Sequence, residues 1–348
     1  MTAALGFLGR NKAIILMLAF VGVFYSGLFL SSQQAREPLP ETQLEKTERT
    51  AREDMKIREQ RFRRNIQAKP ALAGAFSLVF LLVVSLGLCL NFYFFMRKAR
   101  GEELILPSLP HDAVPWGLRE LILVSVFLFF AEASILFFEM MLASFINLKG
   151  IEKDFFLMAN SFLRDVCVAA FVLALVTKKF DRRLVEIGLT LKDFGRNIKT
   201  GVLGYLAVIP ALLALLVVLA LVARAFSYEP PPQPVVEIYL KESTERYLVF
   251  FTIFVAVIGP VIEEIFFRGF AYQALRTRFG IRWGILLSAA IFALFHLNFM
   301  AFFPIFFLGA FLAYLYEKTG SLVSSMTVHM LHNLVMVTLT LGFKSLSV

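Results

Sequence analysis

The pattern of apolar and polar positions divides the chain into long apolar runs that short polar segments join. A membrane-spanning helix needs ~20 mainly apolar residues. The eighth of the runs in this chain is short and begins at Pro304, so we expect a tilted or irregular helix there. The pattern predicts an all-α, polytopic transmembrane helix bundle of about nine spans, with eight as the alternative. The nine runs are 13–31, 71–96, 117–147, 155–177, 201–226, 247–275, 284–303, 304–317 and 321–342.

Two polar segments interrupt this pattern. Residues 41–67 alternate acidic and basic side chains, which predicts a polar extramembrane helix that serves as a solvated spacer or, alternatively, docks a substrate or partner. The stretch "YEPPPQPVV" at 228–236 reads as a rigid linker, and most of the polar motifs follow it. We therefore expect an accessory transmembrane region at 1–200, with a polar loop at 32–70, and a catalytic helix bundle at 201–348 with its motif core at 247–340.

Composition and charge agree with a membrane protein. Hydrophobic residues make up 58% of the chain, and the mean hydropathy is +0.73. The net charge of +9 comes from basic residues in short loops such as "MRKAR" and "KKFDRR", which places those loops in the cytoplasm. We expect a multi-pass protein of the plasma membrane with a cytoplasmic N-terminus, in contact with membrane lipid and without a nucleic-acid partner. Cys89 and Cys167 lie inside apolar runs and are interpreted as packing residues.

The run at 247–275 carries charges that a bilayer disfavours. Glu263 and Glu264 are adjacent, so the ~100° rotation per helical residue points them at different partners. Arg268 follows Glu264 by four residues, the favourable spacing and order for an ion pair, which leaves Glu263 for another partner. Pro260 lacks a backbone donor, so a carbonyl near Ala256 is expected to lose its helical hydrogen bond.

Further polar residues reach the same depth from other runs. At 1.5 Å per residue, Glu263 and His296 each lie ~20 Å from the basic ends of their helices, and His329 and Asn333 lie ~12 and ~18 Å into the last run. His329 and Asn333 are four residues apart and share a helix face, and His332 lies near that face without an assigned role. We expect these side chains to converge in one layer of the membrane.

Such a set suits hydrolysis by an activated water. A carboxylate beside an imidazole deprotonates water, and a second imidazole and an amide donate to a developing oxyanion. Zinc bound by Glu263, His296 and His329 is the alternative, although a site without metal or cofactor is favoured. Two non-peptidase readings also stay open, a non-catalytic membrane scaffold and a proton-coupled transporter.

The motifs EExxxR (Glu263, Glu264, Arg268), FxxxH (Phe292, His296) and HxxxN (His329, Asn333) follow one another on successive spans. In this order, with "EKTGSLVSSMTVHMLHN" around the last motif, they resemble the CAAX protease and bacteriocin-processing (CPBP, Abi) family, which includes the type II CAAX prenyl endopeptidase. The resemblance covers roughly 247–340.

The resemblance implies an intramembrane endopeptidase, of the glutamate type or a metalloendopeptidase. Glu263 and His296 would activate the water, and His329 and Asn333 would bind the oxyanion. Glu264, Arg268 and Phe292 would support them. The implied partner is a peptide or protein substrate, prenylated or otherwise membrane-anchored, that is cleaved at a CAAX tail, a leader or a membrane-protein tail.

The accessory region has intramembrane charges of its own, at Glu132, Glu139, Arg164 and Asp165. Glu132 and Glu139 are seven residues apart and share a helix face, so Arg164 is expected to neutralise one of them. We interpret all four as structural.

Overall fold

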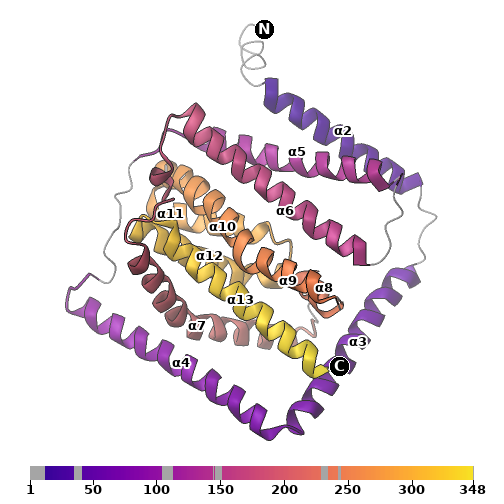
Figure 1. Ribbon diagram of the computed structural model, residues 1–348, viewed down its shortest axis with the longest axis vertical. Helices are drawn as coiled ribbons and strands as arrows, with labels where there is room; N and C mark the ends of the chain where they lie inside the picture. The colour runs from indigo at the N-terminus through magenta and orange to yellow at the C-terminus, as the bar shows by residue number, and fades with distance from the viewer. Residues whose placement is uncertain are drawn as a thin grey trace. The chain divides into compact units, whose positions relative to one another are not determined.

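The computed structural model describes residues 12–34, 41–103, 113–143, 145, 151–228, 234–241 and 244–347. Every regular element in these ranges is helical, which confirms the all-α prediction. Figure 1 shows the helices. They are α2 (Lys12–Gln34), α3 (Glu41–Gln67), α4 (Pro70–Ala99), α5 (Leu118–Ala143), α6 (Ile151–Ala174), η1 (Leu175–Lys179), η2 (Leu184–Ile187), α7 (Phe194–Ala225), α8 (Pro234–Lys241), α9 (Glu245–Ile253), η3 (Phe254–Ile258), α10 (Gly259–Glu264), η4 (Ile265–Tyr272), α11 (Gln273–Leu294), α12 (Phe299–Thr319) and α13 (Leu322–Ser347).

Seven helical segments in the described ranges are long and apolar enough to cross a membrane, and Ile14–Leu30 is a shorter apolar helix. One of the seven, Glu245–Leu294, has 50 residues and contains a sharp turn at Gly280, where φ is 80° and ψ is 172°. A Cβ on Gly284 would lie 2.9 Å from Cα of Arg276, so the chain folds back on itself there. With this segment counted as two arms, the described ranges hold the nine apolar segments that the sequence predicts, and the protein is a multi-pass membrane protein.

The boundary between the seventh and eighth runs differs from the prediction at 303/304. Helix α11 ends at Leu294, and α12 begins at Phe299 with Pro304 inside it. The side chain of Asn298 accepts a hydrogen bond from the Ala301 N–H at 3.0 Å. Asn298 is therefore the helix N-cap, and this local capping bond outweighs the one backbone donor that Pro304 lacks.

The chain forms two compact units, which we describe separately. The first comprises Met1–Ala75, Ile122–Arg164 and Leu339–Val348, of which the ranges given above are described. In it, α3 coincides with the polar helix predicted at 41–67, and Asn65 donates to the backbone oxygen of Leu346 at 2.9 Å. Arg164 pairs with Glu132 at 3.1 Å, which confirms that it neutralises one of the two carboxylates on α5.

The second unit comprises Phe76–Leu121 and Asp165–Thr338 and contains every candidate site residue. Its core cluster joins α7, α12 and α13 through Tyr205, Val208, Leu212, Leu308, Leu312, Leu315 and Val328. Helix α11 packs against α12, and α12 against α7 (Figure 1). A Cβ on Gly309 of α12 would lie 3.0 Å from the Phe292 ring, so these two helices approach closely because Gly309 has no side chain.

Several turns of the second unit meet at one end, which we call the basic end and define as residues 178–188, 276–284 and 316–322. The Gln273 side chain donates to the backbone oxygen of Glu186 at 3.1 Å, the Leu322 N–H donates to the backbone oxygen of Gly188 at 3.0 Å, and Arg276 pairs with Glu317 at 3.0 Å. Three loops that are distant in sequence are thereby fixed to one another.

The second arm of α11 and the whole of α12 form a hairpin that starts and ends at the basic end. The arm from Ile281 to Leu294 extends only ~21 Å, less than the ~30 Å hydrocarbon core. The turn at 295–298 therefore lies at membrane depth, where Leu297 exposes 94% of its surface. Non-helical backbone at this depth is tolerated where it borders a hydrated cavity. The turn contains His296, and its amides at Phe295, His296 and Leu297 donate within the chain to the carbonyls of Ile291, Ala293 and Leu294.

The packing of α4 on α7 gives a test of this unit. A Cβ on Gly87 would lie 2.5 Å from the backbone oxygen of Leu206 and 2.8 Å from Pro210, so Gly87→Ala should destabilise the protein by ~1–3 kcal/mol. Gly74→Ala, in the same helix but with no described atom within 4 Å of the new Cβ, is the matched control. Thermal unfolding in detergent should separate the two variants, and equal melting temperatures would contradict the packing.

Candidate active site

The helical segment that carries the EExxxR motif contains two π-helical stretches, η3 and η4, on either side of α10. In η3 the Gly259 N–H donates to the backbone oxygen of Phe254, five residues earlier, instead of to Val255. In the same π-helical pattern, the Val255 carbonyl would accept from the N–H of residue 260, five positions later. Residue 260 is Pro260, and proline has no N–H. The Val255 carbonyl is therefore left without a partner in its own helix.

Asn333 of α13 supplies that partner, because its Nδ2 donates to the backbone oxygen of Val255 at 2.8 Å. The sequence predicted a free carbonyl near Ala256, and the π-turn moves it one residue earlier. π-Turns recur at functional sites, where they alter the direction of neighbouring side chains. Here the π-turn frees the carbonyl to which Asn333 donates, a structural hydrogen bond that the sequence does not predict.

Glu264 and Arg268 form the predicted ion pair, with Arg268 Nη1 2.7 Å from Glu264 Oε1. Glu264 is fully buried and Arg268 exposes only 1% of its side chain. Arg268 also donates from Nη2 to the backbone oxygen of Gly309 at 3.1 Å, and its guanidinium lies 4.5 Å from the centre of the Phe292 ring. The ion pair thus connects η4 to α11 and α12, because the Phe292 ring of α11 and the Gly309 carbonyl of α12 both stabilise the buried Arg268 charge.

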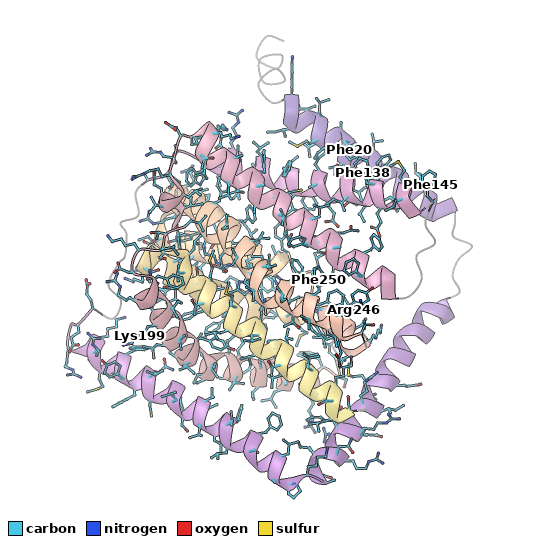
Figure 2. The ribbon with its side chains drawn as sticks, viewed as in Figure 1. Phe20, Phe138, Phe145, Lys199, Arg246 and Phe250 are labelled. Atoms are coloured by element: carbon cyan, nitrogen blue, oxygen red, sulfur yellow. The ribbon has the colours of Figure 1, made fainter. Side chains whose placement is uncertain are left out.

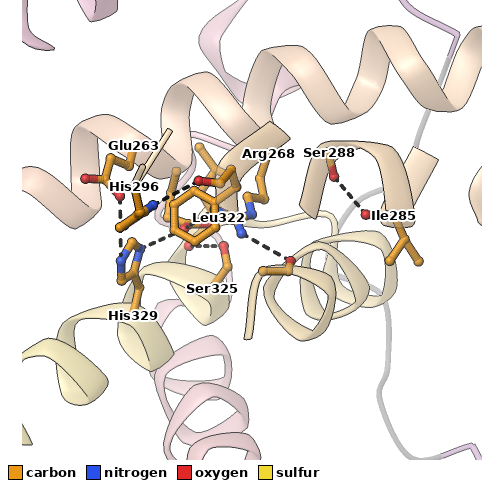
Figure 3. A network of polar contacts seen from close by, with 11 residues as sticks. Glu263, Arg268, Ile285, Ser288, His296, Leu322, Ser325 and His329 are labelled. Atoms are coloured by element: carbon orange, nitrogen blue, oxygen red, sulfur yellow. Dashed lines mark hydrogen bonds and ion pairs between the residues drawn. The ribbon is translucent and has the colours of Figure 1, made fainter. Parts of the chain in front are cut away.

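His329 lies between the two adjacent carboxylates. Its Nδ1 is 2.9 Å from Glu264 Oε1, and its Nε2 is 3.7 Å from Glu263 Oε2 (Figure 3). The Glu264 oxygen that accepts from Arg268 therefore also accepts from His329. Glu263, by contrast, exposes 32% of its side chain. The two glutamates of the motif thus occupy different environments, Glu264 buried and Glu263 partly exposed.

His296 reaches the same region from the turn after α11. Its Nδ1 is 2.9 Å from the backbone oxygen of Phe292, and the Phe292 ring centre lies 5.0 Å from that of His296 and 5.6 Å from that of His329. A carbonyl only accepts hydrogen bonds, so Nδ1 carries the proton and Nε2 keeps its lone pair in the neutral ring. Figure 3 shows Glu263, His296 and His329 together.

The structure brings three of the four predicted catalytic side chains into one cluster. Glu263 and His329 face each other, and His296 shares the Phe292 ring with His329. No hydrogen bond joins His296 directly to Glu263 in the described part of the chain. Asn333 belongs to the same helix as His329 but spends one of its two amide hydrogens on Val255. His332 packs against the Tyr205 ring, 6.1 Å between ring centres, and so faces α7.

The alternative zinc site needs Glu263, His296 and His329 as a converging ligand set. Within the described ranges, no three His, Cys, Asp or Glu side chains gather closely enough to hold a metal ion. The Nδ1 atoms of His329 and His296 are bonded to Glu264 and to a backbone carbonyl, which leaves only Nε2 of each ring as a metal ligand. The residues present do not fit a three-ligand metal site, and no reaction step is derived through one.

Comparison with known proteins supports the resemblance that the motifs carry. Residues 245–335 match the family model described as type II CAAX prenyl endopeptidase Rce1-like, which confirms the resemblance over this segment. No curated protein matches the chain, and no solved structure does. The matched segment includes η3, α10, η4, α11, α12 and the part of α13 that carries His329 and Asn333. The match over this segment suggests a membrane endopeptidase.

The bond between Asn333 and Val255 gives a prediction. Asn333→Ala should cost ~1–3 kcal/mol, because it leaves the Val255 carbonyl without a donor. Pro260→Ala returns an N–H next to that carbonyl, so the same Asn333→Ala substitution should cost less in the Pro260→Ala background. A double-mutant cycle by thermal unfolding in detergent measures this coupling. An equal cost in both backgrounds would show that Pro260 is not the reason why the carbonyl is free.

Proposed function

We propose that the protein is an intramembrane endopeptidase that hydrolyses a peptide bond with a water activated by Glu263 and His296. The observation that carries the proposal is the position of His329 between Glu263 and Glu264, with the Phe292 ring next to both His329 and His296. The family match of this segment supports the reaction class. The roles below are our assignments for this chain.

Glu263 is assigned as the general base. It is the motif glutamate whose side chain is partly exposed, whereas Glu264 is buried and its Oε1 already accepts from Arg268 and His329. A water held by Glu263 and by the Nε2 lone pair of His296 would lose its proton to Glu263 as its oxygen attacks the peptide carbonyl. The proton then passes from Glu263 to the peptide nitrogen, the carbon–nitrogen bond breaks as the carbonyl re-forms, and the amine and the carboxylic acid leave, so the site returns to its starting state.

His329 is assigned to the developing oxyanion. Its Nδ1 is fixed by Glu264, which aims Nε2 toward the space next to Glu263. When the ring is protonated, Nε2–H donates to the oxyanion, and the Glu264 carboxylate balances the charge of the imidazolium. A positioned donor of this kind contributes ~3 kcal/mol to transition-state stability. Asn333 is the second proposed donor, through the amide hydrogen that Val255 does not use.

The surroundings of the cluster favour a membrane-anchored substrate. Leu294, Leu297 and Phe299 expose 61%, 94% and 72% of their surfaces on the turn beside His296. This turn lies at membrane depth, so a peptide reaches it most readily when a hydrocarbon group or an apolar segment anchors it in the same layer. We therefore propose a prenylated or otherwise membrane-anchored peptide or protein tail as the substrate.

The contrast between the two glutamates tests the proposal. Glu263→Gln should lower cleavage by about 10²–10⁴-fold with little change in thermal stability, because it removes a base from an open position. Glu264→Gln should instead lower stability by ~3–5 kcal/mol, because it leaves the buried Arg268 charge uncompensated. Membrane peptidomes of cells with wild type and Glu263→Gln identify the cleaved peptides. The control is Glu237→Gln on α8, whose side chain is 39% exposed. Full turnover by Glu263→Gln would refute the assignment of the base.

Metal dependence gives a second test. Because no three-ligand group is present among the described residues, cleavage of a peptide identified in that way should persist in excess chelator. Elemental analysis of the purified protein should also find less than one zinc ion per chain. Loss of cleavage in chelator, with recovery on added zinc, would require Glu263, His296 and His329 to rearrange into a ligand set and would overturn the metal-free mechanism.

The same experiments distinguish a peptidase from the two alternative functions, a membrane scaffold and a proton-coupled transporter. A scaffold would leave the peptidome unchanged by Glu263→Gln, and a proton-coupled transporter would show solute flux that depends on Glu263. The buried Glu264–Arg268 pair fits any of the three functions. The partly exposed Glu263 carboxylate, which faces the His329 imidazole, favours hydrolysis.

A further inference from the structure

A cavity of about 280 Å³ lies between α4, α7 and α12 in the second unit. Eight of its eleven lining residues are apolar, and the polar ones are Asn91, Thr200 and Tyr314. Val208 and Leu315 line the cavity and also belong to the core cluster, which includes Val328 of α13. A packed layer therefore separates this cavity from His329, and the proposed catalytic cluster does not use it.

The cavity has the dimensions of a hydrocarbon chain. Along α7 it extends from Thr200 to Ala211, ~16 Å at 1.5 Å per residue. The Asn91 amide donates to the backbone oxygens of Gly87 and Ala207, at 2.9 and 2.8 Å, so it holds α4 to α7 and offers no free hydrogen to a ligand. The long part of the cavity is thus suited to an apolar occupant.

Three lysines stand at one end of this cavity. Lys98 follows the lining residue Phe94 by four positions on α4, and Lys318 follows Tyr314 by four positions on α12. Lys199 precedes Leu203 by four positions on α7, and it is labelled in Figure 2 at the N-terminal end of that helix. Residues four apart share a helix face, so each lysine lies on the cavity side of its helix, one turn beyond the lining.

The three lysines meet at the same end because the helices run in opposite directions. Helices α4 and α12 run toward the basic end, and α7 runs away from it, so the C-terminal sides of α4 and α12 adjoin the N-terminal side of α7. All three lysines are exposed, and none has an ion-pair partner among the residues that the structure describes. The result is an apolar cavity with a cationic opening at one face of the bilayer.

We infer that this cavity binds one anionic glycerophospholipid, with an acyl chain between α4, α7 and α12 and the headgroup phosphate among Lys98, Lys199 and Lys318. Charge complementarity favours this occupant, since basic clusters at the ends of membrane helices attract anionic headgroups. Inorganic phosphate would leave the apolar length empty, and a neutral lipid would leave three lysines uncompensated. The inference does not depend on peptidase activity.

The test uses native mass spectrometry of the whole protein in detergent with defined lipids. Phosphatidylglycerol should bind more tightly than phosphatidylcholine of the same chain length, and diacylglycerol and inorganic phosphate should bind weakly. Replacing all three lysines by glutamine should reduce phosphatidylglycerol affinity by about 100-fold, or about fivefold for each lysine. Lys178→Gln removes the same charge from η1, which does not line the cavity, and should have no effect.

A second variant addresses the chain and keeps the test valid if the triple variant does not fold. Ala211 is an exposed lining residue about eleven positions from Thr200, so Ala211→Phe obstructs the apolar end and should weaken both phospholipids equally. Equal binding of phosphatidylglycerol and phosphatidylcholine by the wild type would overturn the anionic site. Binding of inorganic phosphate as tight as that of phosphatidylglycerol, or an equal loss in Lys178→Gln, would overturn it as well.

Discussion

The Glu264 carboxylate accepts from Arg268 and from His329 in a region that the surrounding helices close off. Removing a charge from water costs several kcal/mol, so each buried group in this set depends on the others. Arg268 also donates to the Gly309 carbonyl and lies over the Phe292 ring, and these contacts bring in α12 and α11. One buried pair therefore fixes the relative positions of the three elements that carry the motifs. The orientation of His329, and with it the site, depends on this pair.

Much of this arrangement follows from local rules. The four-residue spacing of Glu264 and Arg268 sets their pairing, and the distances along each helix place Glu263, His296 and His329 at a similar depth. These rules involve one helix at a time, and a sequence provides them directly. They also led to the correct choice of Glu264 as the partner of Arg268, and adjacent helical residues cannot face the same partner, so Glu263 points elsewhere.

The contacts between different helices are harder to predict from the sequence. The sequence does not show that His329 bonds to Glu264 instead of meeting only Glu263, since this depends on how far α13 is rotated. The π-turn before Pro260 moved the free carbonyl to Val255, and it is Asn333, on a different helix, that bonds to it. The start of α12 at Phe299 could have been predicted from Asn298, a residue type that often caps helices. Its capping hydrogen bond stabilises the helix more than the missing N–H of Pro304 destabilises it.

The turn at 295–298 connects the fold to the proposed hydrolysis. A peptidase inside a bilayer needs water where the surroundings exclude it, and a helix that crosses completely would seal that layer. The α11 arm stops after ~21 Å, short of the ~30 Å core. The amides of Phe295, His296 and Leu297 donate within the chain, to the carbonyls of Ile291, Ala293 and Leu294, so it is the carbonyls of the turn that would need partners that lipid does not supply. In the proposed mechanism, water at these carbonyls would also reach His296 and the partly exposed side chain of Glu263. The short arm would thus supply the reactant, and the buried ion pair would keep the proposed catalytic groups in position.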